Sequence, residues 1–408
     1  MTTVKLGEIC DFLNGGAWSD KEYVLTGLPV LKVTNCKPSG FALSDIDYLP
    51  YSAAEKYAKN KLELGDVIIA TVGSHPNLKD SAAGRSCVVN SMVEGYYLNQ
   101  NAVCMRTKDS DVLDQGYLGY LSKYYEFQHF IQMRGRGAAN QMRIAISSIK
   151  EYNCKLPNIE IQRRIASILS AYDDLIENNQ KQIKLLEEAA QRLYKEWFVD
   201  LHFPGYENVK VVDGVPEGWE KKTILDMSSV LRRGISPKYN DKGKYTVINQ
   251  KCIRQTIMDI KESRQQEKEY PADMNLKDSD IVICSTGSGT LGRVGQVFGD
   301  YPDTTFDSHV TLVRAKKPDH SQFLFLTLKY LQPLLMTLGQ GSTNQLELPK
   351  RVIESYGIIC PTEKLIIDFE SAILPIHNKI TSLVSIIKNA TEARDRLLPK
   401  LMSGEVEV

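Results

Sequence analysis

The sequence predicts an α+β protein with two tandem, pseudo-twofold-related α+β domains separated by a pair of long antiparallel coiled-coil helices. Three observations predict this fold class. An apolar 3–4 repeat runs through residues 165–197, it returns 204 residues later, and the segments that precede the two copies also repeat. The resulting order is domain, helix, domain, helix, over residues 1–157, 158–203, 204–361 and 362–408.

The first long helix is predicted from the stretch IASILSAYDDLIENNQKQIKLLEEAAQRLYKEW, residues 165–197. Ten positions at alternating steps of four and three form one stripe, and only Asn179 among them is polar. A narrow stripe of this kind is typical of a coiled-coil seam, whereas a helix on a domain core usually shows a broader one. The seam consists of Ile165, Leu169, Tyr172, Ile176, Asn179, Ile183, Leu186, Ala190, Leu193 and Trp197.

The second long helix repeats this stripe at an offset of 204 residues, with Arg394 as its polar exception. Pro157 and Pro361 precede the two helices at matching places, as expected for helix entries. Pro375 and Pro399 fall inside the second helix, where we expect a kink or a frayed end. Its seam consists of Phe369, Ile373, Ile376, Ile380, Leu383, Ile387, Ala390, Arg394, Leu397 and Leu401.

The two helices are expected to pair with each other in opposite directions, because short chain connections favour that arrangement. Full overlap would place Trp197 near Phe369 and Ile165 near Leu401. About 40 helical residues span roughly 60 Å, so we expect the pair to act as a rod that holds the two globular domains apart.

The globular domains repeat more loosely. LELGDVIIATVGS (residues 62–74) parallels LKDSDIVICSTGS (276–288), and NAVCMRT (101–107) parallels HVTLVRA (309–315). These apolar, β-branched runs predict buried neighbouring strands in a mostly antiparallel sheet. GYLGYLSKYYEFQHFIQM and FLFLTLKYLQPLLMTL predict helices, the latter interrupted at Pro333.

Composition narrows the functional classes. The chain has 50 Lys and Arg against 50 Asp and Glu, which argues against nucleic-acid binding by charge alone. Residues 1–157 carry 17 basic and 16 acidic side chains, and residues 204–360 carry 21 and 19, so neither domain is broadly cationic. The eight Cys are dispersed without a CxxC, and no signal-like or membrane-length apolar segment occurs, so a cytoplasmic protein with reduced thiols is expected.

The sharpest catalytic motif is GSGTLG, residues 287–292, which satisfies GxGxxG. A dinucleotide site would require a helix to open directly after it, yet RVGQVF predicts another strand, and Arg293-Val294 replace the Lys-Ser/Thr of a P-loop. No GxSxG, HExxH or His cluster is present. A Gly-rich strand connection is therefore favoured, with a nucleotide-dependent enzyme as an alternative. No metal site is predicted.

Basic and amide side chains gather in two loops. MRGRGAANQMR (residues 133–143) and SSVLRRGISPKYNDKGKY (228–245) carry groups that bind phosphate or base edges, and RGAANQ parallels QGSTNQ (340–345). Each residue taken singly is also compatible with an ordinary solvated loop. The candidates for DNA contact are Ser74, Arg85, Arg134, Arg136, Asn140, Gln141, Arg143, Arg232, Arg233, Lys238, Ser288, Arg293, Asn344 and Gln345.

The arrangement resembles the specificity subunit of type I restriction–modification systems. The resemblance is carried by LPNIEIQRRIASILSAYDDLIENNQKQIKLLEEAAQRLYKEWFVD, by FPG at residues 203–205, by VPEGWEKKTILDM and by the final ATEARDRLLPKLMSGEVEV. It covers nearly the whole chain. The second helix entry departs from the pattern, because Lys364-Leu365-Ile366 replace Glu160-Ile161-Gln162.

The resemblance implies that each globular domain is a target-recognition domain that reads one half of a bipartite double-stranded DNA site. It also implies helices that set the spacer and dock two methyltransferase subunits, which hold S-adenosylmethionine and modify adenine. The complex could recruit nuclease–translocase subunits that use ATP and Mg²⁺. The chain itself would bind no cofactor and catalyse nothing. The alternative is a non-catalytic scaffold whose coiled coil holds two protein-binding domains apart.

Overall fold

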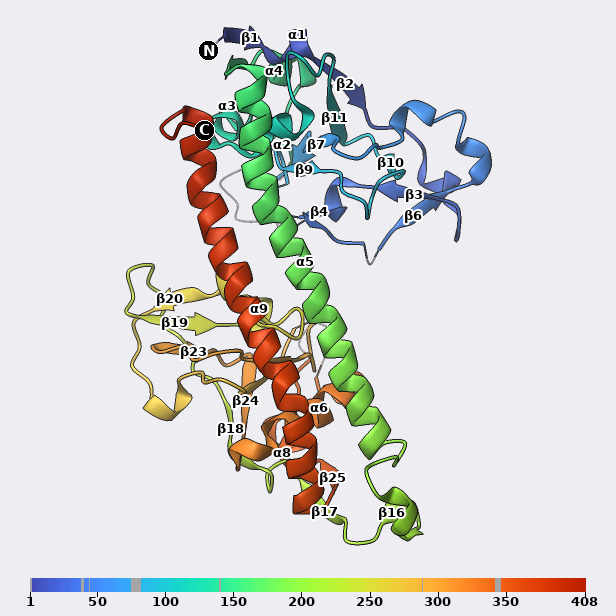
Figure 1. Cartoon of the computed structure of the whole chain (residues 1–408), viewed down its shortest axis with the longest axis vertical. Helices are drawn as coiled ribbons and strands as arrows, with labels where there is room; N and C mark the ends of the chain where they lie inside the picture. Colours follow the sequence, from blue (N-terminus) through green and yellow to red (C-terminus); the bar gives the residue numbers. More distant parts are fainter. Residues whose placement is uncertain are drawn as a thin grey trace. The chain divides into compact units, whose positions relative to one another are not determined.

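The computed structural model describes residues 2–37, 40–43, 45–74, 82–138, 141–287, 289–341 and 346–408, without the side chains of residues 138 and 141. The chain divides into two compact units. The first comprises Met1–Ile176 and Asn389–Val408, and the second comprises Glu177–Lys388. Each unit contains one globular domain and parts of both long helices (Figure 1).

The first unit is built on a four-stranded antiparallel sheet in the order β2-β11-β7-β9. Val67 and Ile69 of β7 belong to one hydrophobic cluster, whereas Ile68 belongs to another, because successive side chains point to opposite faces of the sheet. Both faces are therefore buried, as the uninterrupted apolar runs predicted. The strands are β2 (Cys10–Asn14), β7 (Val67–Ala70), β9 (Ser86–Val88) and β11 (Ala102–Thr107).

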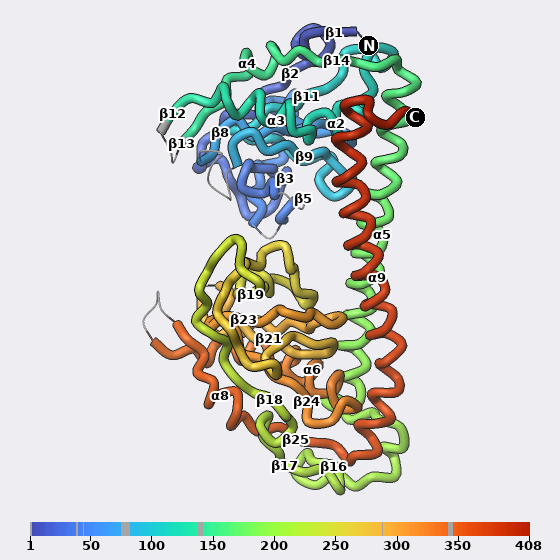
Figure 2. Tube along the Cα trace, turned by 90° about the vertical axis from the view of Figure 1, so that its left-hand side faces the viewer, coloured from blue at the N-terminus to red at the C-terminus, as the bar shows by residue number. Residues whose placement is uncertain are grey.

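Two helices cover one face of this sheet (Figure 2), α2 (Gln115–Lys123) and α3 (Tyr125–Gln132). The predicted single helix is divided at Tyr124, which has extended backbone angles. The Asp114 side chain caps α2 by accepting a hydrogen bond from the Tyr117 N–H at 2.8 Å. Further strands and helices of this unit include β1 (Thr2–Lys5), α1 (Leu6–Ile9), β3 (Leu28–Leu31), β4 (Cys36–Lys37), β5 (Gly40–Phe41), β6 (Asp47–Leu49), β10 (Tyr97–Leu98), α4 (Ile146–Lys150) and β14 (Asn153–Leu156).

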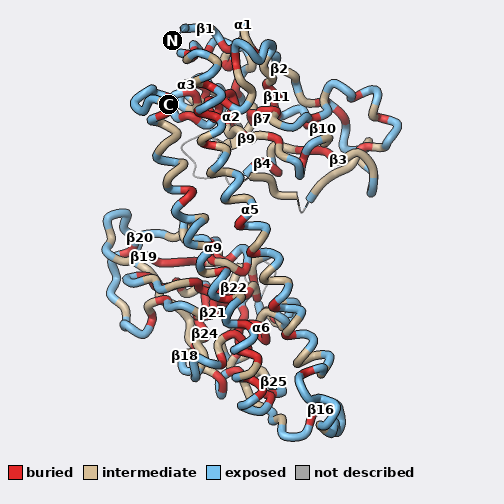
Figure 3. Tube along the Cα trace, viewed as in Figure 1, coloured by how far each residue is buried: buried red, intermediate tan, exposed pale blue. Residues whose placement is uncertain are grey.

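The second unit repeats this topology. Its four-stranded sheet has the order β18-β24-β21-β22, and a smaller sheet β20-β19-β23 corresponds to β6-β3-β10, including one parallel pair in each. Buried residues gather in the central strands of both units (Figure 3). The strands and helices are β15 (Val211–Val212), β16 (Val215–Pro216), β17 (Glu220–Thr223), β18 (Ser228–Arg233), β19 (Tyr245–Ile248), β20 (Arg264–Gln266), β21 (Ile281–Cys284), β22 (Val294–Gln296), β23 (Thr304–Phe306), β24 (Val310–Ala315), α6 (Ser321–Tyr330), α7 (Gln332–Leu335), α8 (Lys350–Glu354) and β25 (Gly357–Cys360).

The long helices are α5 (Ile159–Phe198) and α9 (Glu363–Ser403), and they run side by side within each unit (Figures 1 and 2). In the first unit Ile165 shares a hydrophobic cluster with Leu401. In the second unit the rings of Trp197 and Phe369 have centroids 5.5 Å apart. Late residues of α5 therefore meet early residues of α9, which confirms the predicted antiparallel pairing.

The polar exceptions in the two seams behave differently. Arg394 forms an ion pair with Asp173, with Nη1 and Oδ1 2.6 Å apart. Asn179 is buried, and its Nδ2 has no hydrogen-bond partner among the described residues. The frayed end considered at Pro375 or Pro399 is absent, because α9 remains helical through both and ends at Ser403. Packing along the seam holds the helix despite the two missing N–H donors.

Three general features concern the cysteines, metal binding and membrane-spanning segments of the described part of the chain. The eight Cys are all buried and none forms a disulfide. Among the described residues, no group of three or more His, Cys, Asp and Glu side chains is placed to hold a metal ion. None of the described helices combines the length and apolarity needed to cross a membrane.

Candidate nucleic-acid interface

The first unit places its Gly- and Arg-rich segment in a small antiparallel sheet, β12-β13-β8, beside the end of β7. Its strands are β8 (Val72–Gly73), β12 (Arg136–Ala138) and β13 (Gln141–Arg143). Arg136 lies directly opposite Arg143, and Arg143 lies opposite Val72. Val72 and Arg143, which are 71 residues apart in the sequence, therefore lie side by side in this sheet.

Arg136 and Arg143 point away from the core. Met142, the neighbour of Arg143 in β13, is 2% exposed and belongs to the hydrophobic cluster of the first unit. Because side chains alternate along a strand, Arg143 and its cross-strand partner Arg136 face outward. Both are exposed, and neither side chain makes a hydrogen bond or ion pair with the residues that the structure describes.

Other candidates in the first unit are held by local contacts. The Arg134 guanidinium lies 3.5 Å from the centroid of the Phe130 ring, and its Nη1 donates to the Phe130 carbonyl at 3.2 Å. Arg85 is partly buried and donates through Nη1 to the Cys36 carbonyl at 2.8 Å. Ser74 follows β8 directly. Asn140 lies outside the described residues, and Gln141 is placed in β13 without its side chain.

Two of the candidate arginines of the second unit, Arg232 and Arg233, form ion pairs. Arg233 donates through Nε and Nη2 to the Ser308 carbonyl at 2.9 and 2.7 Å, and its Nη1 pairs with Glu347. Arg232 pairs with Asp273 at 3.2 Å. The guanidinium group of Arg233 is held by three contacts, and the charges of both arginines are balanced by carboxylates.

Two further candidates of the second unit, Lys238 and Arg293, lie outside the ion pairs of Arg232 and Arg233. Lys238 is exposed and pairs with Glu267. Arg293 is partly exposed just before β22. Ser288, Asn344 and Gln345 lie outside the described residues.

The described residues of the GSGTLG segment lie in the connection between β21 and β22. Gly287, Gly289 and Gly292 all have positive φ, which favours glycine. A Cβ on Gly292 would lie 2.6 Å from the Met336 backbone nitrogen, so close packing also requires glycine there. No helix opens after the motif, because β22 begins at Val294. The geometry matches the predicted strand connection and lacks the helix N-terminus that a dinucleotide site needs.

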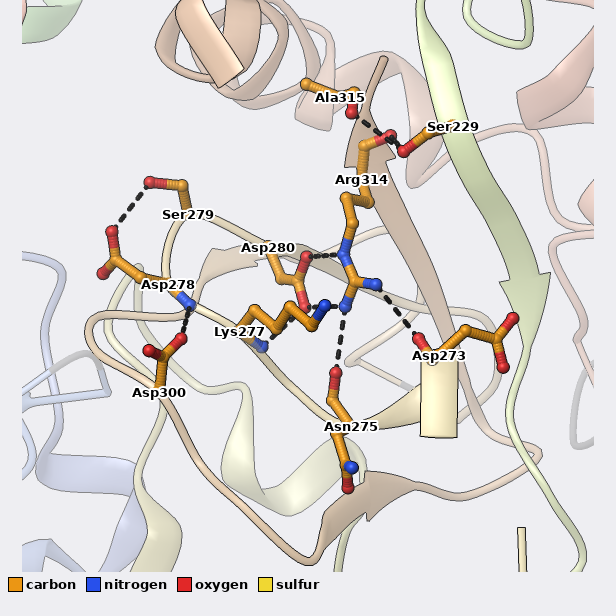
Figure 4. A network of polar contacts seen from close by, with 10 residues as sticks. All are labelled: Ser229, Asp273, Asn275, Lys277, Asp278, Ser279, Asp280, Asp300, Arg314 and Ala315. Atoms are coloured by element: carbon orange, nitrogen blue, oxygen red, sulfur yellow. Dashed lines mark hydrogen bonds and ion pairs between the residues drawn. The ribbon is translucent and has the colours of Figure 1, made fainter. Parts of the chain in front are cut away.

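A paired arginine and aspartate occur in both units and were missed from the sequence. Arg106 Nε and Asp66 Oδ1 are 2.5 Å apart, and the equivalent atoms of Arg314 and Asp280 are 2.6 Å apart. A second bond in each pair, from Nη2 to Oδ2, makes both bidentate. Figure 4 shows how Arg314 also reaches the backbone carbonyls of Asp273 and Asn275.

These two pairs raise the pKa of both arginines, chiefly through the hydrogen bonds to the aspartates. The aspartates are 2% and 1% exposed, whereas the side chains of Arg106 and Arg314 are 25% and 18% exposed, so each pair joins a buried carboxylate to a partly buried guanidinium. The sequence feature that could have revealed these pairs is their matching position in the two repeats. Each Asp directly precedes its buried strand, β7 or β21, and each Arg is the fifth residue of β11 or β24.

Polar contacts also fasten each domain to the long helix that follows it. In the first unit the Tyr120 hydroxyl donates to Asp173 of α5 at 2.8 Å. In the second unit Glu370 of α9 accepts a hydrogen bond from the Phe323 N–H at 2.8 Å. Burial raises the pKa of Glu370 to about 7, with a further contribution from Asp319.

Comparison with known proteins identifies the family. The family model described as "Type I restriction modification DNA specificity domain" matches residues 1–188 and 216–382, which together are most of the chain. The chain belongs to this family. It is therefore a specificity subunit of a type I restriction–modification system, which serves in DNA sequence recognition and is not itself catalytic.

Individual relatives agree with this assignment. The type I restriction enzyme MjaIX specificity subunit of Methanocaldococcus jannaschii is 26% identical over 308 residues, covering 72% of this chain and 69% of the relative. The HindI specificity subunit of Haemophilus influenzae is 24% identical over 429 residues, covering 86% and 88%. A crystal structure of the type I S subunit from M. genitalium has a TM-score of 0.58 at 16% identity, covering 98% of this chain and 95% of the other, and supports the fold.

Proposed function

We propose that each globular domain of this specificity subunit is a target-recognition domain that reads one half of a bipartite DNA site. The observation that carries the proposal is the duplicated topology. Both units present an arginine-bearing region beside the end of the central strand, at β8 and β13 in the first and around Thr286 and Glu347 in the second. Two similar readers with different side chains suit an asymmetric site of two half-sites.

The helices α5 and α9 set the spacing between the half-sites in this proposal. Each contributes residues to both compact units, which supports a spacer role. The outer faces of the pair would dock two methyltransferase subunits, which bind S-adenosylmethionine and methylate adenine. Nuclease–translocase subunits that use ATP and Mg²⁺ would join that complex. The proposed location is the cytoplasm.

An exchange of one domain tests the division of labour. Residues 1–157 are replaced by the corresponding domain of another specificity subunit, and the chain is expressed with its methyltransferase partner. Sequencing of modified adenines in the host genome should show one half-site changed, with the other half-site and the spacer retained. A change in both half-sites, or in neither, would contradict the proposal. A second exchange over residues 204–361 is the matched control and should alter the opposite half-site.

A further inference from the structure

One position of the two hairpin surfaces carries opposite charges in the two units. In the first unit Val72, Arg143 and Arg136 lie side by side across β8, β13 and β12. In the second unit Thr286, Glu347 and Gln340 are joined by bridges in the same order. Val72 and Thr286 are equivalent, because each follows the end of its buried central strand, β7 or β21, by two residues. Arg143 lies opposite Val72 and Glu347 lies opposite Thr286, so Arg143 corresponds to Glu347.

The residue that pairs with Glu347 in the second unit also differs in the first unit. Arg233 lies opposite Thr311, and Asn14 lies opposite Val103, which is the corresponding residue of the first unit. The second unit thus places Arg233 and Glu347 in one ion pair. The first unit has the neutral Asn14 in place of Arg233, and it has two adjacent cations in place of Glu347 and Gln340.

Two cations in register are unfavourable without an anion. Cross-strand partners on one face have Cβ atoms about 4.5–5.5 Å apart, and like charges in such positions destabilise a sheet. Arg136 and Arg143 share the outward face, and among the described residues neither has an acidic partner. A single phosphate placed between the guanidinium groups would accept hydrogen bonds from both.

The arrangement suits phosphate better than a base edge. A base-reading arginine needs a fixed direction, because its two donors must meet two acceptors of one guanine. Arg233 has such support from Ser308 and Glu347, whereas Arg136 and Arg143 have none among the described residues. Unsupported guanidinium groups can still follow a phosphate, whose charge accepts bonds from many directions.

We propose that Arg136 and Arg143 bind one DNA backbone phosphate and anchor the first domain, whereas the second domain lacks this anchor. This inference rests on the proposed reading of one half-site by each domain. In this inference Arg136 and Arg143 contribute to DNA affinity and to the position of the domain on the duplex. Other groups of the domain distinguish the bases.

The test uses the full chain in complex with its methyltransferase partner. Binding to a duplex with the recognition site and to a scrambled duplex of equal length is measured between 50 and 200 mM salt. Each phosphate charge neutralised contributes about 0.9 to the slope of log K against log salt. Because the pair is proposed to bind one phosphate, the double variant Arg136→Gln, Arg143→Gln should lower the slope by about 0.9. The preference for the recognition site should stay within about twofold.

Lys155→Gln is the matched control. Lys155 is exposed on β14 and pairs with no acidic side chain among the described residues, and it lies in a different sheet from the hairpin. Its replacement should leave the slope unchanged. Thermal unfolding of all variants verifies that each remains folded.

The possible outcomes separate the two proposals. An unchanged slope in the double variant overturns the phosphate anchor. So does a loss of preference for the recognition duplex well beyond twofold in the double variant, which would make Arg136 or Arg143 a base reader. A wild-type complex that does not prefer the recognition duplex would instead contradict the proposed function itself.

Discussion

The two domains hold the same arginine–aspartate pair inside and carry different charges on the corresponding surface. Arg106 with Asp66 and Arg314 with Asp280 are bidentate pairs at equivalent places, and both aspartates are almost fully buried. On the hairpins, by contrast, Arg143 of one domain corresponds to Glu347 of the other.

The difference follows from solvent exposure. An arginine that loses its partner inside the protein retains an uncompensated charge, so both members of a buried pair must be kept together. An exposed side chain can change its charge at little cost, because water and salt screen it. The duplicated fold can therefore keep its internal pair while each surface adapts to a different ligand.

Removal of the internal aspartate tests this explanation most strongly. Asp280→Ala should lower the free energy of unfolding of the second domain by about 3–5 kcal/mol, because Arg314 is left largely buried without its carboxylate. Asp66→Ala should cost less, since Arg106 retains Glu63, whose Oε1 lies 2.8 Å from its Nη1. Native-state hydrogen exchange of peptides that cover β21 and β7 measures each domain separately.

The exposed pair of Arg232 and Asp273 provides the control for this experiment, with side chains 40% and 53% exposed. Asp273→Ala should change the free energy of unfolding by at most about 1 kcal/mol. Equal losses for Asp280→Ala and Asp273→Ala would show that burial does not explain why the internal pair occurs in both domains.

The contacts between domain and helix should give the units different pH responses. The pKa of Glu370 is raised to about 7, so between pH 4.5 and 7 the native second unit binds a proton that the unfolded chain has released. The free energy of unfolding should therefore fall as pH rises through this window. One pKa unit corresponds to about 1.4 kcal/mol, so the whole change is about 3–4 kcal/mol.

Glu370→Gln should remove this pH dependence, because the amide accepts the Phe323 N–H at every pH. Asp319 and His377 also contribute to the environment of Glu370 and remain in the variant. Hydrogen exchange of α6 at pH 5 and pH 8 measures the effect, with Glu392→Gln on the exposed face of α9 as the control. A pH response of α6 that persists in Glu370→Gln would assign it to another group.

The sequence predicted those parts of the fold that depend on apolar periodicity. The strands β7, β11, β21 and β24 and the antiparallel helices follow from runs that bury one or both faces. The Asp66–Arg106 pair could not be predicted in this way, because 40 residues separate its members and only strand register brings them together.

The hairpin was harder to predict than the central sheet. Its described strands contain one buried apolar anchor, Met142, so the sequence does not fix which residues lie opposite each other. Arg233 and Arg143 consequently had equal standing as candidates, although the structure gives a carboxylate partner only to Arg233 among the described residues. The strand register distinguishes Arg143 from Arg233. It is set by the pairing of β13 with β8 in the first unit and by the pairing of Thr286 with Glu347 in the second.

A charge exchange between the two hairpins gives the finest test, with the smallest expected effect. Arg143→Glu introduces the acidic residue of the second domain opposite Arg136, so repulsion across β12 and β13 becomes attraction. The free energy of unfolding of the first domain should rise by about 0.2–1 kcal/mol at low salt. The gain should shrink at 1 M salt, where the Debye length is about 3 Å.

The reciprocal variant Glu347→Arg should act in the opposite direction, because it places a second cation beside Arg233. Thermal unfolding of the free chain at low and high salt measures both variants without DNA, so the result does not depend on the ligand. If the first domain does not gain stability from Arg143→Glu at low salt, Arg136 and Arg143 do not repel each other in the free protein. The need for an anion between them would then disappear, while the buried pairs would remain explained by their burial alone.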